Sequence, residues 1–265
     1  MDKDKPWDMG HKPGYEFWKH QESAQQRGIT REQFVDEHNN PDNYRPELSS
    51  TNRSRQLEDK TDAYFGALRV SPVSSLTADR RAVANAARTA LGGQVSVAAY
   101  GDQTGAKTID ILTAHGSPVP DVAAYATIGL HEHHIGFTTE GQQLLVELVG
   151  AAYERFVDLP NILATGVFEV LDHDYTLYPG AVLRSVVAQY ATGAAVKHLL
   201  LVSPFSWDGR LQRVTVDAGL VTWLQAVPIT DAELLIAIQE GSGALERRLE
   251  SEHVDVFDLQ RPSAI

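Results

Sequence analysis

The chain has 265 residues, of which 43% are hydrophobic, so it can bury a core in one large domain or two smaller ones. It has no cysteine, which excludes disulfides and thiolate-bound zinc. It also has no apolar run of about 18 residues and no apolar signal segment at its start, so we expect neither a membrane span nor a secretory signal. These features predict a cytoplasmic protein. The formal net charge of −12 argues against non-specific binding of a phosphate backbone by the whole molecule.

Charge and apolar residues are distributed unevenly along the chain. Residues 1–57 contain few aliphatic residues and carry nine Lys/Arg against ten Asp/Glu, a net of −1. Residues 58–265 carry 14 against 25, a net of −11, and Ala, Val and Leu dominate from about Leu76 onward. The stretch between has no sustained apolar period and ends in a Ser/Pro cluster. We therefore predict a first part at 1–57, a linker at 58–75 and a second part at 76–265.

The first part reads as mostly helical. Residues 14–27 form a candidate helix with Phe17 and Trp18 on its apolar side and Gly28 just past its end. A second helix follows Thr30 and ends at the Asn39-Asn-Pro sequence, because proline disfavours helical backbone in the residue before it.

The second part alternates predicted helices and strands. Thr77 caps an Ala-rich helix that ends at Gly92-Gly93, and Thr139 opens a helix over 140–156 with Leu144, Leu145, Leu148, Ala152 and Phe156 on one face. Thr230 and Glu233 form a capping box for a helix at 231–239. The other predicted elements are strands at 95–100, 108–114, 124–130, 198–202 and 220–227 and helices at 181–190 and 243–252. This pattern predicts an α+β fold with a mixed sheet flanked by helices.

Three blocks of the first part carry a family resemblance. The blocks are WDMGHKP at 7–13, ITREQFVDEHNNPDNYRPE at 29–47 and LSSTNRSR at 48–55. Together they resemble the C-terminal half of the GH-E family of HNH/Endo VII (ββα-metal) nuclease toxins. The resemblance implies phosphodiester hydrolysis, in which a neutral imidazole accepts a proton from water and a divalent metal stabilises charge on the phosphate.

Carried over residue by residue, this resemblance makes His11 the catalytic base, with Gly10 permitting close approach beside it. Glu47 would be the acidic member, Asn52 would orient the base or the phosphate, and Asp8 with Glu47 would hold Mg²⁺ or Zn²⁺. Family members also carry an upstream hairpin with paired cysteines, which this chain lacks, and a histidine where Arg55 stands here. A guanidinium cannot bind a metal cation, so we expect the first part not to be active alone.

The second part resembles the suppressor of fused (Sufu) domain family over about 76–259. The resemblance rests on AYATIGLHEHHI at 124–135, GQQLLVELVGAAYERF at 141–156, YPGAVLRSVVAQY at 178–190, KHLLLVSPFSW at 197–207 and VTWLQAVPITDAELLIAIQEG at 221–241. In bacteria such domains accompany polymorphic toxins as immunity proteins. The resemblance therefore implies binding without a cofactor, with a cognate nuclease toxin as the partner.

Three further polar clusters are alternative sites. His131 and His133 would share one face of an extended strand and could bind a metal, although a third ligand is not evident, and an exposed polar strand end is the alternative. The LDHDY sequence at 171–175 is typical of a hairpin or loop turn. Surface residues around Trp207, Asp208 and Asp217 could contact a basic partner or simply be solvated.

We weigh three functions. The first is an immunity protein of a toxin system, in which a Sufu-like domain neutralises a nuclease toxin and is fused to a GH-E fragment; an acidic protein would suit a basic nuclease. The second is an active metal-dependent nuclease with an accessory Sufu domain. The third is a Sufu-type interaction protein unrelated to toxins.

Overall fold

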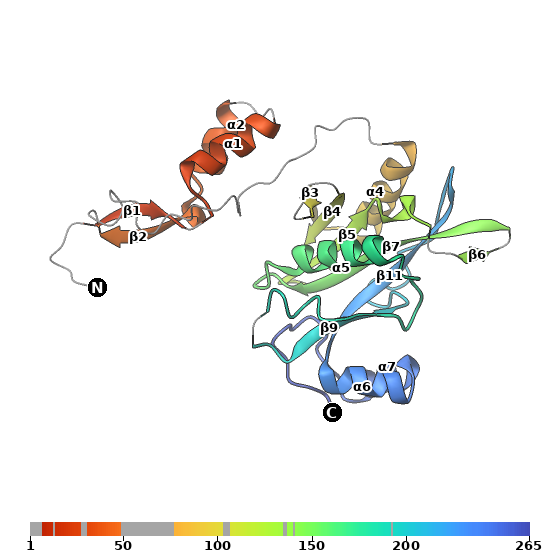
Figure 1. The fold of residues 1–265 in the computed structure, drawn as a ribbon. Coiled ribbons are helices and arrows are strands. Elements are labelled where there is room, and N and C mark those ends of the chain that lie inside the picture. The colour runs from red at the N-terminus through yellow and green to blue at the C-terminus, as the bar shows by residue number, and fades with distance from the viewer. Residues whose placement is uncertain are drawn as a thin grey trace. The chain divides into compact units, whose positions relative to one another are not determined.

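The chain divides into two compact units, Met1–Ser74 and Ser75–Ile265 (Figure 1). The computed structural model describes residues 7–12, 14–27, 31–48, 77–102, 107–134, 137–139, 141–191 and 193–265. The predicted linker at 58–75 lies outside these residues, as do Gly28 and Thr30. None of the described helices has both the length and the apolar character that crossing a bilayer requires.

The first unit combines one antiparallel strand pair with short helices. β1 (Trp7–His11) pairs with β2 (Tyr44–Leu48), and α1 (Phe17–Arg27), α2 (Arg31–His38) and the 3-10 helix η1 (Pro41–Asn43) lie between them in the sequence. Both predicted helices are present, although α1 begins at Phe17. Gly14 has a φ of 86°, which is incompatible with a right-handed helix.

The second unit is a mixed β-sheet with helices on both faces. Its strands, within the described residues, run in the order β3-β4-β5-β7-β11-β9-β8, with β6 pairing to β7 and β10 to β11. The pairing of β7 with β11 is parallel, and the other pairings among the described strands of this sheet are antiparallel. The strands are β3 (Gln94–Gly101), β4 (Thr108–His115), β5 (Val122–Ile128), β6 (Phe137–Thr139), β7 (Gln142–Tyr153), β8 (Val182–Leu183), β9 (Val196–Val202), β10 (Val214–Val216) and β11 (Gly219–Thr230).

Alternate residues of the central strands pack into different core clusters. Ile111 of β4 and Leu148 of β7 contact the cluster that contains α5 (Leu159–His173), whereas Leu112 and Val149 join the cluster that contains α4 (Ala78–Leu91). At the β9 end a third cluster contains residues of α7 (Ser242–Ser251), with α6 (Asp231–Gln239) packed against it. Figure 1 shows α5 lying across the sheet and α6 with α7 beside β9. The predicted α+β class with a mixed sheet flanked by helices is confirmed.

The helix predicted over 140–156 is wrong, because this stretch forms the twelve-residue strand β7. Leu145 and Val149 face one core cluster, while Val146 and Leu148 face the other. A strand buried on both faces is apolar at successive positions, so its sequence also satisfies a helical period. The core packing on both faces therefore decides the conformation.

The helix predicted over 181–190 is also wrong. Only β8 forms there, and Ser185 follows it with a φ of 60°, a left-handed conformation that interrupts regular structure before a series of turns. The helix α5 was not predicted from the sequence, and residues 171–175 were predicted to form a turn. Those residues are the end of α5 and its left-handed cap at Asp174. The Pro at the start of α5 was an available signal.

Candidate functional site

In the first unit, the strand pair brings several predicted nuclease residues together. Asp8 is the Cα partner of Glu47, and His11 is the partner of Tyr44. Gly10 is buried between them on β1. The register therefore places the two predicted metal-binding positions opposite each other. The Glu47 side chain and the whole of Asn52 lie outside what the structure describes.

His11 lies within a group of aromatic and imidazole rings. Its ring centroid is 4.6 Å from that of Tyr44, 5.2 Å from that of His38 and 6.4 Å from that of His20. The Tyr44 hydroxyl donates to the His38 carbonyl oxygen at 2.9 Å and lies 3.2 Å from His38 Nε2. Burial lowers the pKa of His38, so this imidazole favours its neutral form.

This ring group does not by itself form a metal centre. Among the described residues, no group of three or more His, Asp or Glu side chains is arranged to hold a metal ion. The described residues thus hold the His38 imidazole in its neutral form, and they provide no basis for a metal-assisted step. The predicted roles of Asp8, Gly10, His11, Glu47 and Asn52 stay predictions.

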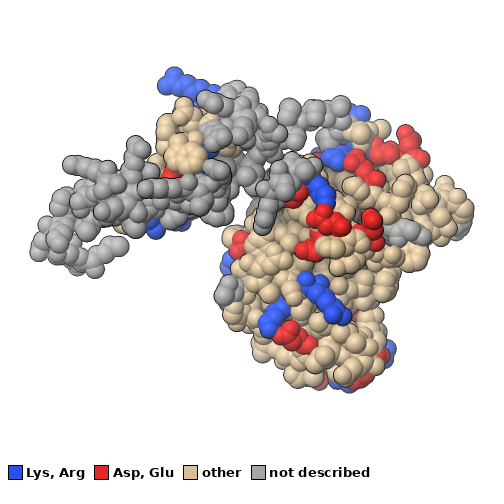
Figure 2. All heavy atoms as spheres, viewed as in Figure 1, with Lys and Arg blue, Asp and Glu red and all other residues tan. Residues whose placement is uncertain are grey.

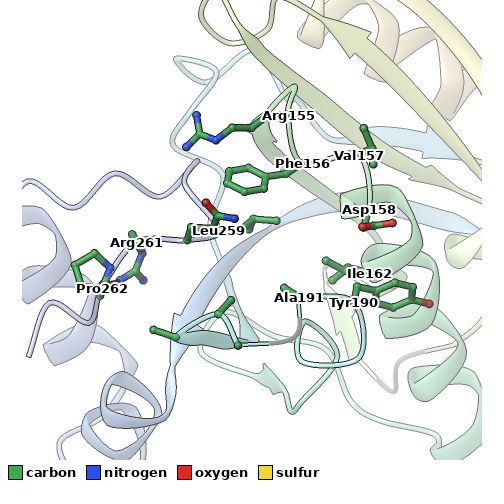
Figure 3. Close-up of a pocket in the computed structure, with 14 residues that line it drawn as sticks. Arg155, Phe156, Val157, Asp158, Ile162, Tyr190, Ala191, Leu259, Arg261 and Pro262 are labelled. Atoms are coloured by element: carbon green, nitrogen blue, oxygen red, sulfur yellow. Dashed lines mark hydrogen bonds between the residues drawn. The ribbon is translucent and has the colours of Figure 1, made fainter. Parts of the chain in front are cut away.

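In the second unit, the candidate site is an open pocket of about 800 Å³. Its wall comes from the β7–α5 connection, from α5, from the loop that precedes β9 and from the C-terminal segment. In Figure 3, Asp158, Ile162 and Tyr190 lie at one end of the pocket, whereas Arg261 and Pro262 lie at the other. A pocket of this size fits a ligand or a short segment of another protein.

The two arginines of the pocket are held by carboxylates of the same unit. Arg261 donates from Nη1 and Nη2 to the two carboxylate oxygens of Glu233, at 2.6 and 2.7 Å, and both side chains are buried. Arg155 Nη2 lies 3.1 Å from Asp258 Oδ1, and its guanidinium lies over the Phe156 ring at 4.6 Å. The charge of Arg261 is therefore fully paired in the interior, whereas Arg155 is a half-exposed cation with one carboxylate contact.

The predicted metal site at residues 131–134 has a different geometry from the one expected. His131 belongs to the 3-10 helix η2 (Leu130–Glu132) rather than to an extended strand, and it is buried. Its Nδ1 donates to Glu147 Oε1 at 2.5 Å, and Gly129 N donates to the same oxygen at 2.7 Å. Glu147 is fully buried, so the pair of His131 and Glu147 is part of the core, whereas Glu132, His133 and His134 are exposed after the end of β5.

The predicted surface around Trp207 is partly wrong. Asp208 and Asp217 are exposed, but Trp207 is 1% exposed and its Nε1 donates to Ser117 Oγ at 3.3 Å. The indole belongs to the core cluster beneath α4, because its large apolar surface gains more from burial than from solvent contact. This tryptophan cannot form part of a binding surface without unfolding.

Comparison with known families decides the identity of the second unit. Residues 105–262, more than half of the chain, match the family model described as suppressor of fused protein (SUFU). The chain belongs to the SUFU family. Residues 1–58 of this SUFU protein match the model of GH-E, described as an HNH/ENDO VII superfamily nuclease with conserved GHE residues. Both resemblances inferred from the sequence are thus confirmed.

Two individual proteins are similar to the SUFU unit. Immunity protein YqcF of Bacillus subtilis (strain 168) is 34% identical over 191 residues, which are 72% of this chain and 99% of that protein. The crystal structure of a putative SUFU homolog from Neisseria gonorrhoeae FA 1090 superposes with a TM-score of 0.57 over 71% of this chain and 97% of that one, at 13% identity. At that identity, the second likeness concerns the fold alone.

The pocket of the SUFU unit was not predicted from the sequence. Its residues belong to segments that were read as helix, as turn or as chain end, and they meet only in the folded sheet. One signal was available. From Phe156 to Leu183 the sequence contains no Lys or Arg, yet it contains Asp158, Glu169, Asp172 and Asp174. The same stretch exposes Tyr175 and Tyr178, and exposed aromatic residues are enriched at interaction surfaces.

Proposed function

We propose that this chain is an immunity protein, and that its SUFU unit binds and neutralises a nuclease toxin of the GH-E type in the cytoplasm. The observation that carries the proposal is the 34% identity to an immunity protein over 99% of that protein's length. The GH-E match at residues 1–58 supports the choice of toxin class, since it occurs in the same chain.

The electrostatics of the SUFU unit suit this partner. Residues 75–265 carry 12 Lys/Arg against 22 Asp/Glu, a net of −10. Figure 2 shows both charge signs on the visible face of this unit, with Asp and Glu gathered in its upper half. A nuclease presents positive charge toward its phosphate substrate, so an acidic protein gains association rate and selectivity against it.

The proposal is tested by protection of cells and by complex formation. Candidate GH-E nuclease toxins would be expressed with and without the full-length chain, while survival and nucleic-acid integrity are followed. We expect survival only when both are expressed, together with a complex that can be isolated at micromolar concentration. Association should slow as salt rises from about 0.05 to about 0.5 M, because the Debye length shrinks about threefold over that range.

The control is the same toxin with its Gly-His histidine replaced by alanine, which should bind without killing the cells. A chain that neither protects nor forms a complex with either form of the toxin would remove the immunity function. It would leave a SUFU-type interaction protein of another kind.

A second candidate function is phosphodiester hydrolysis by the first unit. It is favoured by the register that places Asp8 opposite Glu47 on the strand that ends in His11. Cleavage of DNA or RNA by the full-length chain would be measured with Mg²⁺, Mn²⁺ and Zn²⁺, beside His11→Ala and, as a control on the exposed side of α1, Gln21→Ala. Cleavage that is lost only in His11→Ala would establish this activity, whereas absence of cleavage in all three proteins would reject it.

A further inference from the structure

Asp158 is the one ionisable group at the pocket that the described structure leaves without a partner. Its side chain is exposed, makes no capping hydrogen bond to α5 and forms no hydrogen bond or ion pair with any described residue. Arg155 and Arg261 are held by Asp258 and Glu233. An incoming cation would therefore find an unpaired carboxylate, whereas each of the two guanidiniums already has a carboxylate partner.

Arg261 retains one hydrogen-bond donor, its Nε, that has no acceptor among the described residues. This atom is closed off from solvent. A ligand cannot reach it without displacing the C-terminal segment that Arg261 anchors through Glu233. This donor therefore offers nothing to an anion that enters the pocket.

The remaining wall is apolar and aromatic. Phe156, Ile162, Ala191 and Leu259 line it, and Tyr190 lies beside Ile162 at the Asp158 end (Figure 3). The Tyr190 hydroxyl is within 2.7 Å of Thr165 Oγ1, which holds the ring against α5. Such a wall accommodates the methylene groups of a long side chain, and aromatic rings attract a cation above their faces.

We propose that this pocket receives a Lys or Arg side chain from a basic surface segment of the partner, with its methylenes against the apolar wall and its cation at Asp158. The inference rests on the proposed function and names the anchor by which the toxin is held. A volume of about 800 Å³ exceeds one side chain, so the neighbouring residues of the partner segment enter with it. No Lys or Arg lies within residues 156–183, and Arg155, directly before this stretch, is paired with Asp258.

The first test is the affinity of the full-length chain for the catalytically inactivated form of a candidate GH-E nuclease, measured by titration calorimetry. Asp158→Asn should weaken binding about tenfold, because the partner's cation would lose its charge partner once the complex excludes water from the pocket. The matched control is Asp174→Asn at the other end of α5, which removes the same charge outside the pocket and should change affinity less than about twofold. Both variants should melt within about 1 °C of the parent protein, since neither side chain forms a hydrogen bond with a described residue.

Two further variants separate pocket binding from general electrostatics. Ala195→Trp places a large side chain at an exposed position of the pocket wall and should weaken binding without changing net charge. Asp158→Lys should abolish binding, and replacing the responsible Lys or Arg of the nuclease with Glu should restore it. Restoration by one partner position identifies the anchor directly.

The outcomes distinguish the two proposals. If the parent chain binds and protects, but Asp158→Asn and Ala195→Trp behave like the Asp174→Asn control, the anchor is located elsewhere and only this inference is overturned. If the parent chain forms no complex with the nuclease, the proposed function and the anchor are both rejected.

Discussion

The buried ion pair between Arg261 and Glu233 holds the C-terminal segment against the SUFU sheet. Replacing Arg261 with Met tests how much this pair contributes to the free energy of unfolding. Besides its two bonds to Glu233, Arg261 Nη2 donates to the Pro228 carbonyl oxygen at 2.8 Å. Glu233 also accepts from Thr230 N and Ala264 N, both at 2.9 Å. One guanidinium thus connects the end of β11, the start of α6 and the chain terminus.

The expected loss follows from burial. The side chains of Arg261 and Glu233 are 5% and 0% exposed, so Arg261→Met leaves a carboxylate in the interior without its countercharge. Removing one member of a buried pair costs about 3–5 kcal/mol of unfolding free energy. The two backbone donors to Glu233 remain, which places the expectation at the lower end, about 3 kcal/mol. Because Glu233→Met in the same chain removes the stranded charge, the double variant should lose less than the sum of the single variants.

Urea unfolding of the full-length chain measures these losses. Trp207 and Trp223 are buried in the SUFU unit, so their fluorescence reports its unfolding. Arg248→Met is the control, since its bridge to Glu240 joins two half-exposed side chains and is worth about 0–1 kcal/mol. A loss below about 1 kcal/mol for Arg261→Met, equal to that of the control, would refute the reasoning that burial makes this pair essential.

Two other predictions concern the same unit. The pKa of Glu233 is lowered, since burial alone would raise it but the hydrogen bonds from Arg261, Ala264 and Thr230 outweigh that effect. The Glu233 carboxylate therefore stabilises the fold fully above its ordinary pKa of 4.5, and this stabilisation is lost as pH falls through the lowered pKa. Unfolding free energies measured from pH 6 to pH 2 should accordingly fall more steeply for the parent than for Glu233→Gln. Gly219→Ala should lower the unfolding free energy in urea by more than about 3 kcal/mol, because the new Cβ would lie 2.4 Å from the Gln143 carbonyl oxygen at a φ of 153°. Gly209→Ala, at a φ of 70° in open space, should lose only about 1–2 kcal/mol. Equal losses for the two variants would contradict the clash at Gly219.

Elements with local end signals were predictable from the sequence. Thr77 accepts from Arg80 N at 3.1 Å and α4 ends at Leu91, directly before Gly92, as the cap residues indicated. The capping box of Thr230 and Glu233 is present at the start of α6. These interactions join residues a few positions apart, so the sequence contains both partners in one short window.

Elements defined by distant packing were not predictable in this way. The same apolar run that forms β7 could serve a helix, and the parallel pairing with β11 decides its conformation across about 75 residues of intervening chain. In the first unit, the pairing of β1 with β2 is likewise formed across two helices. The sequence named Asp8, His11 and Glu47 through a family resemblance, but only the register showed that Asp8 and Glu47 lie opposite each other.

The pocket is lined by segments that were not predicted correctly from the sequence. Asp158 stands at the start of α5, Tyr190 follows the stretch wrongly predicted as a helix, and Arg261 anchors a terminal segment without regular structure. Sheet strands fix the positions of these three segments, yet none of the segments needs a strong secondary-structure pattern of its own. Exposed positions such as Asp158 and Ala195 can therefore change without loss of the sheet, whereas Ile162 and Arg261 are fixed by the core. Under the proposed function, such exposed positions would let the chain follow changes in its toxin while the core that supports them stays constant.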